Sequence, residues 1–342
     1  MKSKTFILLL IISCMLAGAV YYKFSCHNGK SKQSGDVGKL FNALPVERIS
    51  QIIINSREGV VTLKKDDSVW VIEKKAGYLA DFSLITQLIT NLTTAKIGRS
   101  FHSSPDAKAR LALYPPDESK SDKDATGIEV VLMDGKGEVL ADTVIGKTRE
   151  ITAGAGGHYV MPKGGQSIFL VDKKFDDLGK SDLDWIRKNI LEVKEEEIEK
   201  VVCMPLDDDK IVYTLKRPEQ GKAMELAGMA KADDLDPSRI DDVTTALDPL
   251  SINDIAGRID GPGLPAAAYT HRFTYYLFTG EVYEFIPGEA EDKNLKKFYL
   301  KVIPVAPGKD KALSRLNQWV YEIPDWKFGR FINAPDALLK KQ

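Results

Sequence analysis

Apolar and polar residues alternate in short segments along most of this chain, a pattern typical of strands with one face in a core and the other in solvent. Residues 61–64 and 212–216 alternate in this way, as do residues 127–133 and 138–145. The polar, glycine-rich residues 134–137 separate the last two segments and predict a tight turn. The pattern therefore predicts short strands that are joined largely as antiparallel hairpins.

Two segments follow the helical period instead, and each begins with an aspartate. Asp81 and Asp236 can accept the free N–H groups of a first helical turn, and Pro237 suits the first helical position. Gly98 and Gly257 come after these segments, and we expect each glycine to take the left-handed cap at the end of its helix. The apolar positions of each segment fall on one face: Ile85, Leu88, Ile89 and Leu92 in the first, and Ile240, Val243, Leu247 and Leu250 in the second.

The same elements occur in the same order in both halves of the chain. Ile49 and Ile52 correspond to Ile198 and Val201 at an offset of 149 residues, and seven segments correspond in all. The offset grows to 159 at the ends of the two helical segments, as insertions in loops would cause. The prediction is an α+β fold of two tandem related units, each mostly antiparallel sheet with one or two helices.

An uninterrupted apolar stretch at residues 5–22 precedes both units. As a helix it would span about 27 Å, close to the roughly 30 Å of a bilayer core. Lys2 and Lys4 predict that its N-terminus stays inside the cell, so the body of the protein would lie in the periplasm or outside the cell. A signal peptide cleaved near Ala19 and a lipoprotein signal with Cys14 as the lipidated residue are the alternatives, and all three interpretations predict export.

The predicted organisation has four parts. Residues 1–24 form an inner-membrane anchor or signal segment, and the Gly/Ser/Lys-rich residues 25–44 form a tether. The first α+β unit occupies residues 45–191 and the second occupies residues 192–342.

Composition excludes several classes of protein. Of 342 residues, 43% are hydrophobic and 28% are charged, as in folded globular chains. Lys and Arg number 48 against 49 Asp and Glu, and without residues 1–24 the balance is 45 against 49. A mildly acidic body argues against a nucleic-acid binder, which needs a basic surface. Three cysteines and four histidines are too few for a disulfide-stapled or multi-zinc scaffold.

Motifs for catalysis or for cofactor binding are weak. The glycine-rich residues 146–157 lack the Lys-Ser/Thr end of a phosphate-binding loop and lead into a predicted strand, so we interpret them as a loop between strands. His102, His158 and His271 are too far apart in sequence to predict a zinc site. Residues 207–209, three aspartates, lack the spacing of a calcium loop and predict a turn.

The cysteines allow one pairing, between Cys26 and Cys203 in an oxidising compartment. A free thiol at Cys26 and a Cys203 buried in a strand are the simpler interpretation. The sequence therefore predicts no catalytic residue, no cofactor site and no metal site.

Aromatic residues are densest near the C-terminus. They could form a platform that binds a partner or ligand, or they could pack the core of the last strands. The platform candidates are Trp319, Tyr321, Trp326 and Phe328.

The region around Trp70 resembles a bacterial exported family, the domain-of-unknown-function family number four-three-four-zero. The residues that carry the resemblance are the Trp70-Val71-Ile72 strand, the Gly77-Tyr78-Leu79-Ala80-Asp81 helix start, and the helix that runs to Leu92. A later Gly-Leu-Asp-Pro phrase of the family reads Ala112-Leu113-Tyr114-Pro115 here, so two of its four positions differ. The resemblance covers roughly residues 45–260.

This resemblance implies an N-terminally anchored extracytoplasmic protein that is associated with ABC transport systems of the gliding-motility type. It implies no catalytic residues. The leading hypothesis is a non-enzymatic accessory or partner-binding protein whose partner is an ABC-type permease or another envelope protein. The alternatives are a protein that binds cell-envelope glycans through the C-terminal aromatics, and an envelope hydrolase whose site is assembled from residues distant in sequence.

Overall fold

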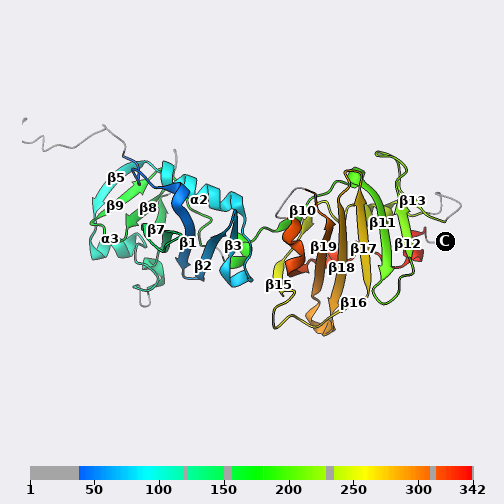
Figure 1. Ribbon diagram of the computed structural model, residues 1–342. Helices are drawn as coiled ribbons and strands as arrows, with labels where there is room; N and C mark the ends of the chain where they lie inside the picture. The colour runs from blue at the N-terminus through cyan, green and yellow to red at the C-terminus, as the bar shows by residue number, and fades with distance from the viewer. Residues whose placement is uncertain are drawn as a thin grey trace, which may run out of the picture.

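The computed structural model describes residues 38–118, 122–149, 156–179, 181–228, 235–308 and 313–340. The predicted membrane segment at residues 5–22, with Cys14, Ala19 and Cys26, lies outside these ranges. None of the helices in the described ranges is long and apolar enough to cross a membrane. Two large antiparallel sheets lie side by side along the molecule (Figure 1), so the predicted architecture of mostly antiparallel sheet with few helices is confirmed.

The first sheet has nine strands in the order β4-β3-β2-β1-β6-β7-β8-β9-β5. Its strands are β1 (Ile49–Ser56), β2 (Gly59–Asp66), β3 (Val69–Ile72), β4 (Tyr78–Leu79), β5 (Ile97–His102), β6 (Ile128–Asp134), β7 (Val139–Arg149), β8 (Gly157–Pro162) and β9 (Ser167–Val171). The predicted hairpin at residues 127–145 is the β6–β7 pair, in which Val130 lies opposite Thr143. The predicted loop at residues 146–157 falls between β7 and β8, but its first four residues belong to β7 and Gly157 belongs to β8, and residues 150–155 lie outside the described ranges.

Helix α2 (Phe82–Thr94) covers one face of this sheet. Its N-terminus forms as predicted, because the Asp81 side chain accepts a hydrogen bond from the Ser83 backbone N–H at 2.9 Å. Ile85, Leu88 and Leu92 are buried, which confirms the predicted apolar face. This face and the inward residues of β1, β2 and β6 fill the core of the first half.

A second, smaller cluster lies on the opposite face of the first sheet. There Leu113, after α3 (Pro105–Arg110), packs on Val144, Met161 and Ile168. The chain passes so close to the sheet that a Cβ added at Gly146 would lie 2.2 Å from the Leu111 carbonyl oxygen. Only glycine allows this approach.

The second sheet runs in the order β13-β12-β11-β17-β18-β19-β20-β15, and β16 adds to β18. Its strands are β11 (Ile198–Pro205), β12 (Tyr213–Lys216), β13 (Glu225–Leu226), β15 (Asp254–Arg258), β16 (Ala267–Tyr269), β17 (His271–Leu277), β18 (Val282–Ala290), β19 (Phe298–Ala306) and β20 (Trp319–Ile323). Helix α5 (Pro237–Thr244) begins at the predicted cap Asp236, and its residues Ile240 and Val243 are buried. The aspartates at 207–209 lie between β11 and β12, in agreement with the predicted turn.

Short elements complete the described fold. Strand β10 (Asn189–Leu191) pairs with β14 (Leu250–Ser251) between the two large sheets. The remaining short helices are α4 (Asp182–Trp185), α6 (Asp325–Phe328), and the 3₁₀ turns η1 (Val46–Arg48), η2 (Glu73–Lys75), η3 (Lys123–Ala125), η4 (Glu195–Glu197), η6 (Lys293–Leu295), η7 (Leu313–Gln318) and η8 (Pro335–Leu338).

The expected glycine caps are wrong. Helix α2 ends at Thr94 and α5 ends at Thr244, whereas Gly98 lies within β5 and Gly257 lies within β15. Each glycine falls where the pairing of its strand shifts register, and Gly257 has a φ of 155°. These glycines therefore mark bulges in edge strands, which is the other common use of glycine near the end of an element.

Candidate functional site

The two halves meet at Tyr78, a residue of β4 in the first sheet whose ring contacts residues of the second half. Its ring packs edge-on against Trp319 and Tyr321, with centroid distances of 5.1 Å and 5.9 Å. Its hydroxyl donates a hydrogen bond to the Arg187 carbonyl oxygen at 3.0 Å. Tyr78 is fully buried, and this burial raises its pKa well above the usual value. An aromatic side chain in this setting acts as an anchor between the two halves.

Polar contacts surround this aromatic anchor. The Trp319 indole N–H donates to the Ala76 carbonyl oxygen at 3.1 Å. The Lys75 ammonium lies 2.8 Å from Asp254, and Arg315 lies 3.1 Å from Asp66. One hydrophobic core runs through both halves. The junction is therefore a packed and hydrogen-bonded interface rather than a loose linker.

A groove of about 530 Å³ opens beside this junction, within the size range of ligand sites in proteins. One side comes from β3, β4 and the start of α2, and the other side comes from the segment that leads into the second half. Phe82, the first residue of α2, has 65% of its side chain exposed. The lining residues are Ser68, Val69, Trp70, Leu79, Ala80, Asp81, Phe82, Ser83, Arg187, Lys188 and Asn189.

The charged side chains of the groove differ in their hydrogen-bond and ion-pair partners. The Asp81 carboxylate caps α2, since one of its oxygens accepts hydrogen bonds from the Ser83 N–H and hydroxyl at 2.9 Å and 2.5 Å. Arg187 is held through its backbone N–H to the Leu79 carbonyl and through Nε to the Asn189 carbonyl, at 3.0 Å and 3.1 Å. In the described part of the chain, no carboxylate lies within ion-pair distance of the Arg187 guanidinium. The groove thus offers apolar surface and a fixed cation.

The structure separates the four aromatic residues of the predicted platform. Trp319 and Tyr321 are buried and enclose Tyr78, so they cannot belong to an exposed platform, and this expectation is corrected in favour of core packing. Phe328 is half-buried and stacks on Phe298 at 4.5 Å. Only Trp326 of the four is largely exposed, at 57%. For Trp319 and Tyr321 the structure therefore shows the second of the two alternatives, core packing, here against Tyr78 of the first half.

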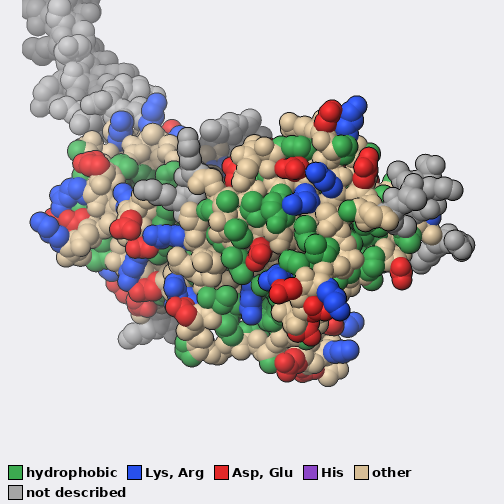
Figure 2. Space-filling model, turned by 45° about the vertical axis from the view of Figure 1, so that its right-hand side comes forward, with side chains coloured by type: hydrophobic (Ala, Val, Ile, Leu, Met, Phe, Trp, Pro, Cys, Tyr) green, Lys and Arg blue, Asp and Glu red, His purple; other side chains and the backbone are tan. Residues whose placement is uncertain are grey.

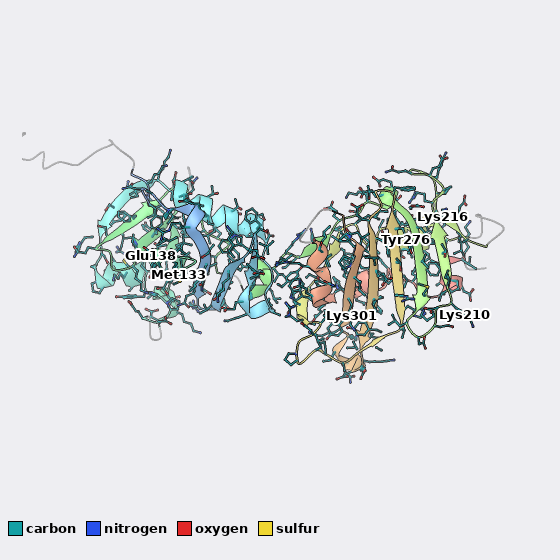
Figure 3. All side chains as sticks on the ribbon, in the orientation of Figure 1. Met133, Glu138, Lys210, Lys216, Tyr276 and Lys301 are labelled. Atoms are coloured by element: carbon teal, nitrogen blue, oxygen red, sulfur yellow. The ribbon has the colours of Figure 1, made fainter. Side chains whose placement is uncertain are left out.

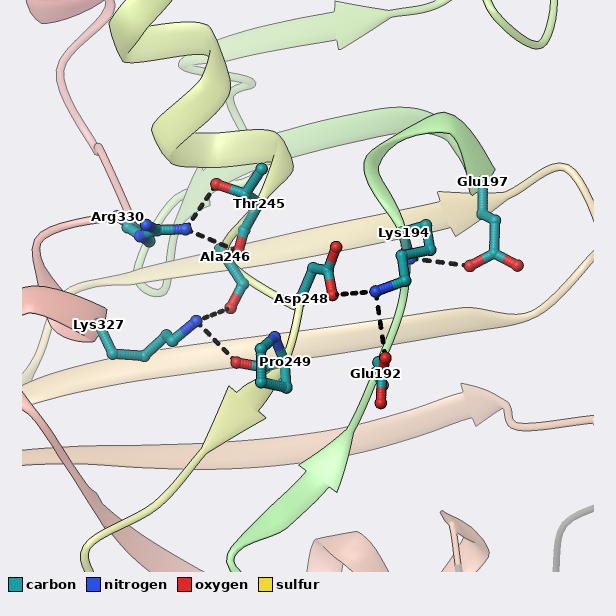
Figure 4. A network of polar contacts seen from close by, with 9 residues as sticks. All are labelled: Glu192, Lys194, Glu197, Thr245, Ala246, Asp248, Pro249, Lys327 and Arg330. Carbon is teal, nitrogen blue, oxygen red and sulfur yellow. Dashed lines mark hydrogen bonds and ion pairs between the residues drawn. The ribbon is translucent and has the colours of Figure 1, made fainter.

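A buried lysine holds the end of α5 (Figure 4). The Lys327 ammonium donates to the carbonyl oxygens of Ala246 and Pro249 at 2.9 Å and 2.8 Å, and its side chain is fully buried. Burial, and secondarily the neighbouring Arg330, lower the pKa of Lys327 to about 8. Arg330 donates to the Thr245 carbonyl at 2.9 Å. Two cations therefore satisfy carbonyls at the negative end of a helix dipole.

The three histidines and the cysteine that the sequence offered as candidates all lie in strands of the two sheets. His158 is buried, with Nδ1 accepting from the Phe175 N–H at 3.2 Å and Nε2 lying 3.0 Å from the Thr148 hydroxyl. Cys203 is buried in β11, and burial raises the pKa of its thiol to about 12. His102 lies in β5 and His271 in β17, so the sheets keep the three histidines on separate strands. In the part of the chain that the structure describes, no cluster of three or more His, Cys, Asp or Glu side chains could hold a metal ion.

Sequence reasoning missed the residues that build the groove and the junction. Tyr78 and Asp81 lie in the Gly-Tyr-Leu-Ala-Asp run that carried the family resemblance, which was the one available signal. Arg187 and Lys188 lie near the predicted boundary between the two units and gave no separate signal. A phenylalanine directly after a helix cap, as Phe82 follows Asp81, is a further signal that a sequence pattern can supply. The structure shows that Phe82 is exposed.

Comparison with known proteins gives one result. No curated protein and no solved structure matches the chain. The family described as Domain of unknown function (DUF4340) matches residues 70–269, more than half of the chain. The match starts at Trp70 in β3 and ends at Tyr269 in β16, so it includes most of the groove and crosses the junction. The chain belongs to the DUF4340 family of domains of unknown function.

Proposed function

We propose that this protein is a membrane-anchored, extracytoplasmic, non-enzymatic component of the cell envelope that binds a partner protein through the junction groove. The partner implied by the family resemblance is the permease of an ABC-type transport system. The observation that carries the proposal is the groove itself, which holds a largely exposed phenylalanine beside a rigid junction. Exposed aromatics set in a fixed surface are typical anchors of protein interfaces.

The side chains of the groove support binding more than chemistry. One oxygen of Asp81 and the hydroxyl of Ser83 are engaged with each other in the cap of α2. What faces a ligand is chiefly the exposed Phe82, beside the buried Trp70 and Leu79, together with the cations Arg187 and Lys188. Such a surface can recognise a partner without transforming it.

We also propose that the two halves are copies of one unit. The order β3-β2-β1-β6-β7-β8-β9-β5 of the first sheet parallels the order β13-β12-β11-β17-β18-β19-β20-β15 of the second, while β4 extends only the first sheet and β16 branches only from the second. The helix caps correspond as well, since Asp236 holds Ser238 as Asp81 holds Ser83. The residue before each cap forms a bridge to a later segment, Ala80 with Ile186 and Leu235 with Leu339. These likenesses extend the sequence repeat to the helix caps and to the end of each half.

Photo-crosslinking tests the proposed function most directly. Benzoylphenylalanine in place of Phe82 should crosslink in cells to an ABC-type permease or to another identified envelope protein. The same group in place of Val305, which is 57% exposed on the second sheet, is the control and should not give this product. Equal crosslinking at both positions, or products that are all cytosolic, would contradict the proposal.

The proposed location is the inner membrane, with residues 1–24 as a single-pass anchor and both halves outside the cytoplasm. Cysteine labelling can test it, since the thiol of Cys203 is buried and poorly ionised whereas Cys26 would lie just beyond the membrane. A membrane-impermeant maleimide should label intact spheroplasts, and Cys26→Ser should abolish the labelling. Labelling that requires lysis of the spheroplasts would place this end of the protein inside the cell.

Glycan binding is retained as a second candidate because Trp326 is 57% exposed, and an exposed indole ring can stack against a sugar. A glycan-array signal that disappears with Trp326→Ala would favour it. The same signal in the Trp326→Ala variant would assign the binding elsewhere.

A further inference from the structure

We propose that the junction groove takes an extended peptide segment in which acidic and apolar residues alternate. This inference rests on the proposed function, because it names the chemistry of the partner segment that the groove would hold. It follows from the different character of the two sides of the groove: one exposes Phe82 and has as its carboxylate Asp81, which caps α2, and the other carries Arg187 and Lys188.

The apolar side is built from β3, β4 and α2. Val69 is half-buried, Trp70 and Leu79 are buried, and Phe82 at the start of the helix is 65% exposed. Because the gain from burying apolar surface grows with its area, covering the exposed phenylalanine is one of the larger gains that a partner could make here. A partner should therefore bring apolar side chains to this side.

The cationic side is Arg187-Lys188. Three hydrogen bonds position Arg187. Its backbone N–H donates to the Leu79 carbonyl, its backbone carbonyl accepts from the Tyr78 hydroxyl, and its side-chain Nε–H donates to the Asn189 carbonyl. Lys188 is exposed, and its nearest acid is Asp184 at 4.0 Å, which is a weak surface pair. A guanidinium held in place loses little further freedom when it binds a carboxylate, so a partner carboxylate is favoured on this side.

An extended peptide fits two unlike sides because its successive side chains point in opposite directions. Alternation of apolar and acidic residues would place one kind against Val69 and Phe82 and the other against Arg187 and Lys188. On the face shown in Figure 2, acidic and basic side chains are interspersed around the apolar areas. Charge complementarity thus selects an acidic–apolar segment over a basic one.

The test uses the purified full chain in mild detergent and three fluorescent hexapeptides. The probes alternate leucine with glutamate, with glutamine or with lysine, and binding is measured by fluorescence anisotropy. The glutamate peptide should bind about tenfold more tightly than the glutamine peptide, and its affinity should fall as salt rises from about 0.05 to 0.5 M. The lysine peptide should bind most weakly.

Substitutions in the groove test whether the peptides bind there. The double variant Arg187→Gln, Lys188→Gln should reduce the preference for glutamate over glutamine to about twofold or less, because the attraction between opposite charges is lost. Phe82→Ser should weaken both peptides. Lys216→Gln is the matched control, since Lys216 lies on β12 far from the junction (Figure 3), and it should leave binding unchanged.

Equal binding of the glutamate and glutamine peptides, or an unchanged preference in the double variant, would overturn the inference. Palmitate is tested as a competitor probe in the same assay, and binding of palmitate with no binding of any peptide would overturn the inference in favour of a lipid ligand. The photo-crosslink at Phe82 separates the two levels: if it still recovers a permease when the peptide preference is absent, the proposed function stands and only the partner chemistry fails.

Discussion

At the scale of single residues, the most unusual group is Lys327. A fully buried ammonium is costly, and here two carbonyl oxygens and the end of α5 offset the cost in part. The lowered pKa shows that the compensation is incomplete. The carbonyls themselves follow α5 at Ala246 and Pro249, where no helical N–H is available to them.

Lys327→Met should therefore destabilise the protein by about 2–4 kcal/mol at pH 7, because it keeps the apolar stem and leaves two buried carbonyls without a donor. Urea unfolding measures the change. The matched control is Lys216→Met, which removes an exposed lysine and should change the free energy of unfolding by less than about 0.5 kcal/mol.

The effect of Lys327→Met should grow with pH. The pKa of Lys327 is about 8 in the folded protein against 10.5 for an ordinary lysine, so between these values the unfolded chain binds more protons. Stability from this group consequently rises with pH across that window, by about 2 kcal/mol from pH 7 to pH 10. The variant lacks this rise, so the difference in unfolding free energy between wild type and variant should widen. A difference that stays constant over this range would mean that Lys327 is not desolvated as described.

At the scale of elements, the sequence supports most of the secondary structure because its signals are local. Alternation predicted β2, β6, β7 and β12, and the Asp caps predicted where α2 and α5 begin. The misassigned elements are the ends of the helices, where Gly98 and Gly257 serve strand bulges instead. A glycine permits either use, and only the pairing with β9 or β20 decides between them.

A substitution at Gly146 tests how closely the segment after α3 must approach β7. A Cβ there would meet the backbone oxygens of Leu111 and Ala112 at 2.2 Å and 2.9 Å, and the Lys147 N–H bonds the Leu111 carbonyl at 2.9 Å. Gly146→Ala should force this segment away and lower stability by about 2–3 kcal/mol. Gly135→Ala is the control: its nearest neighbour would be the Ser50 hydroxyl at 3.6 Å, so we expect a change below about 0.5 kcal/mol in thermal unfolding. Equal effects of the two substitutions would contradict this account.

At the scale of the whole molecule, the groove could not be predicted from the sequence, because it depends on contacts between residues far apart in the chain. Tyr78 and Trp319 are 241 positions apart, and no local pattern relates them. The aromatic density near Trp319 allowed either a binding platform or core packing, and it could not show that Trp319 and Tyr321 pack against a residue of the first half. The linker residues Arg187 and Lys188 acquire a role only because the junction fixes them beside α2.

The junction should make the two halves unfold together. Because one core runs through both and Tyr78 is buried between Trp319 and Tyr321, calorimetry of the wild type should show a single cooperative transition. Tyr78→Ala removes both ring contacts and the hydrogen bond to Arg187, at a cost of about 3–5 kcal/mol. The loss falls on the coupling between the halves, so the transition should split in two and proteolysis should increase at residues 187–194.

Tyr276→Ala, which removes a half-buried tyrosine from the second sheet away from the junction (Figure 3), should shift the transition without splitting it. If Tyr78→Ala also gave one lowered transition, the shared core rather than the tyrosine would hold the halves together, and the groove would keep its shape in this variant.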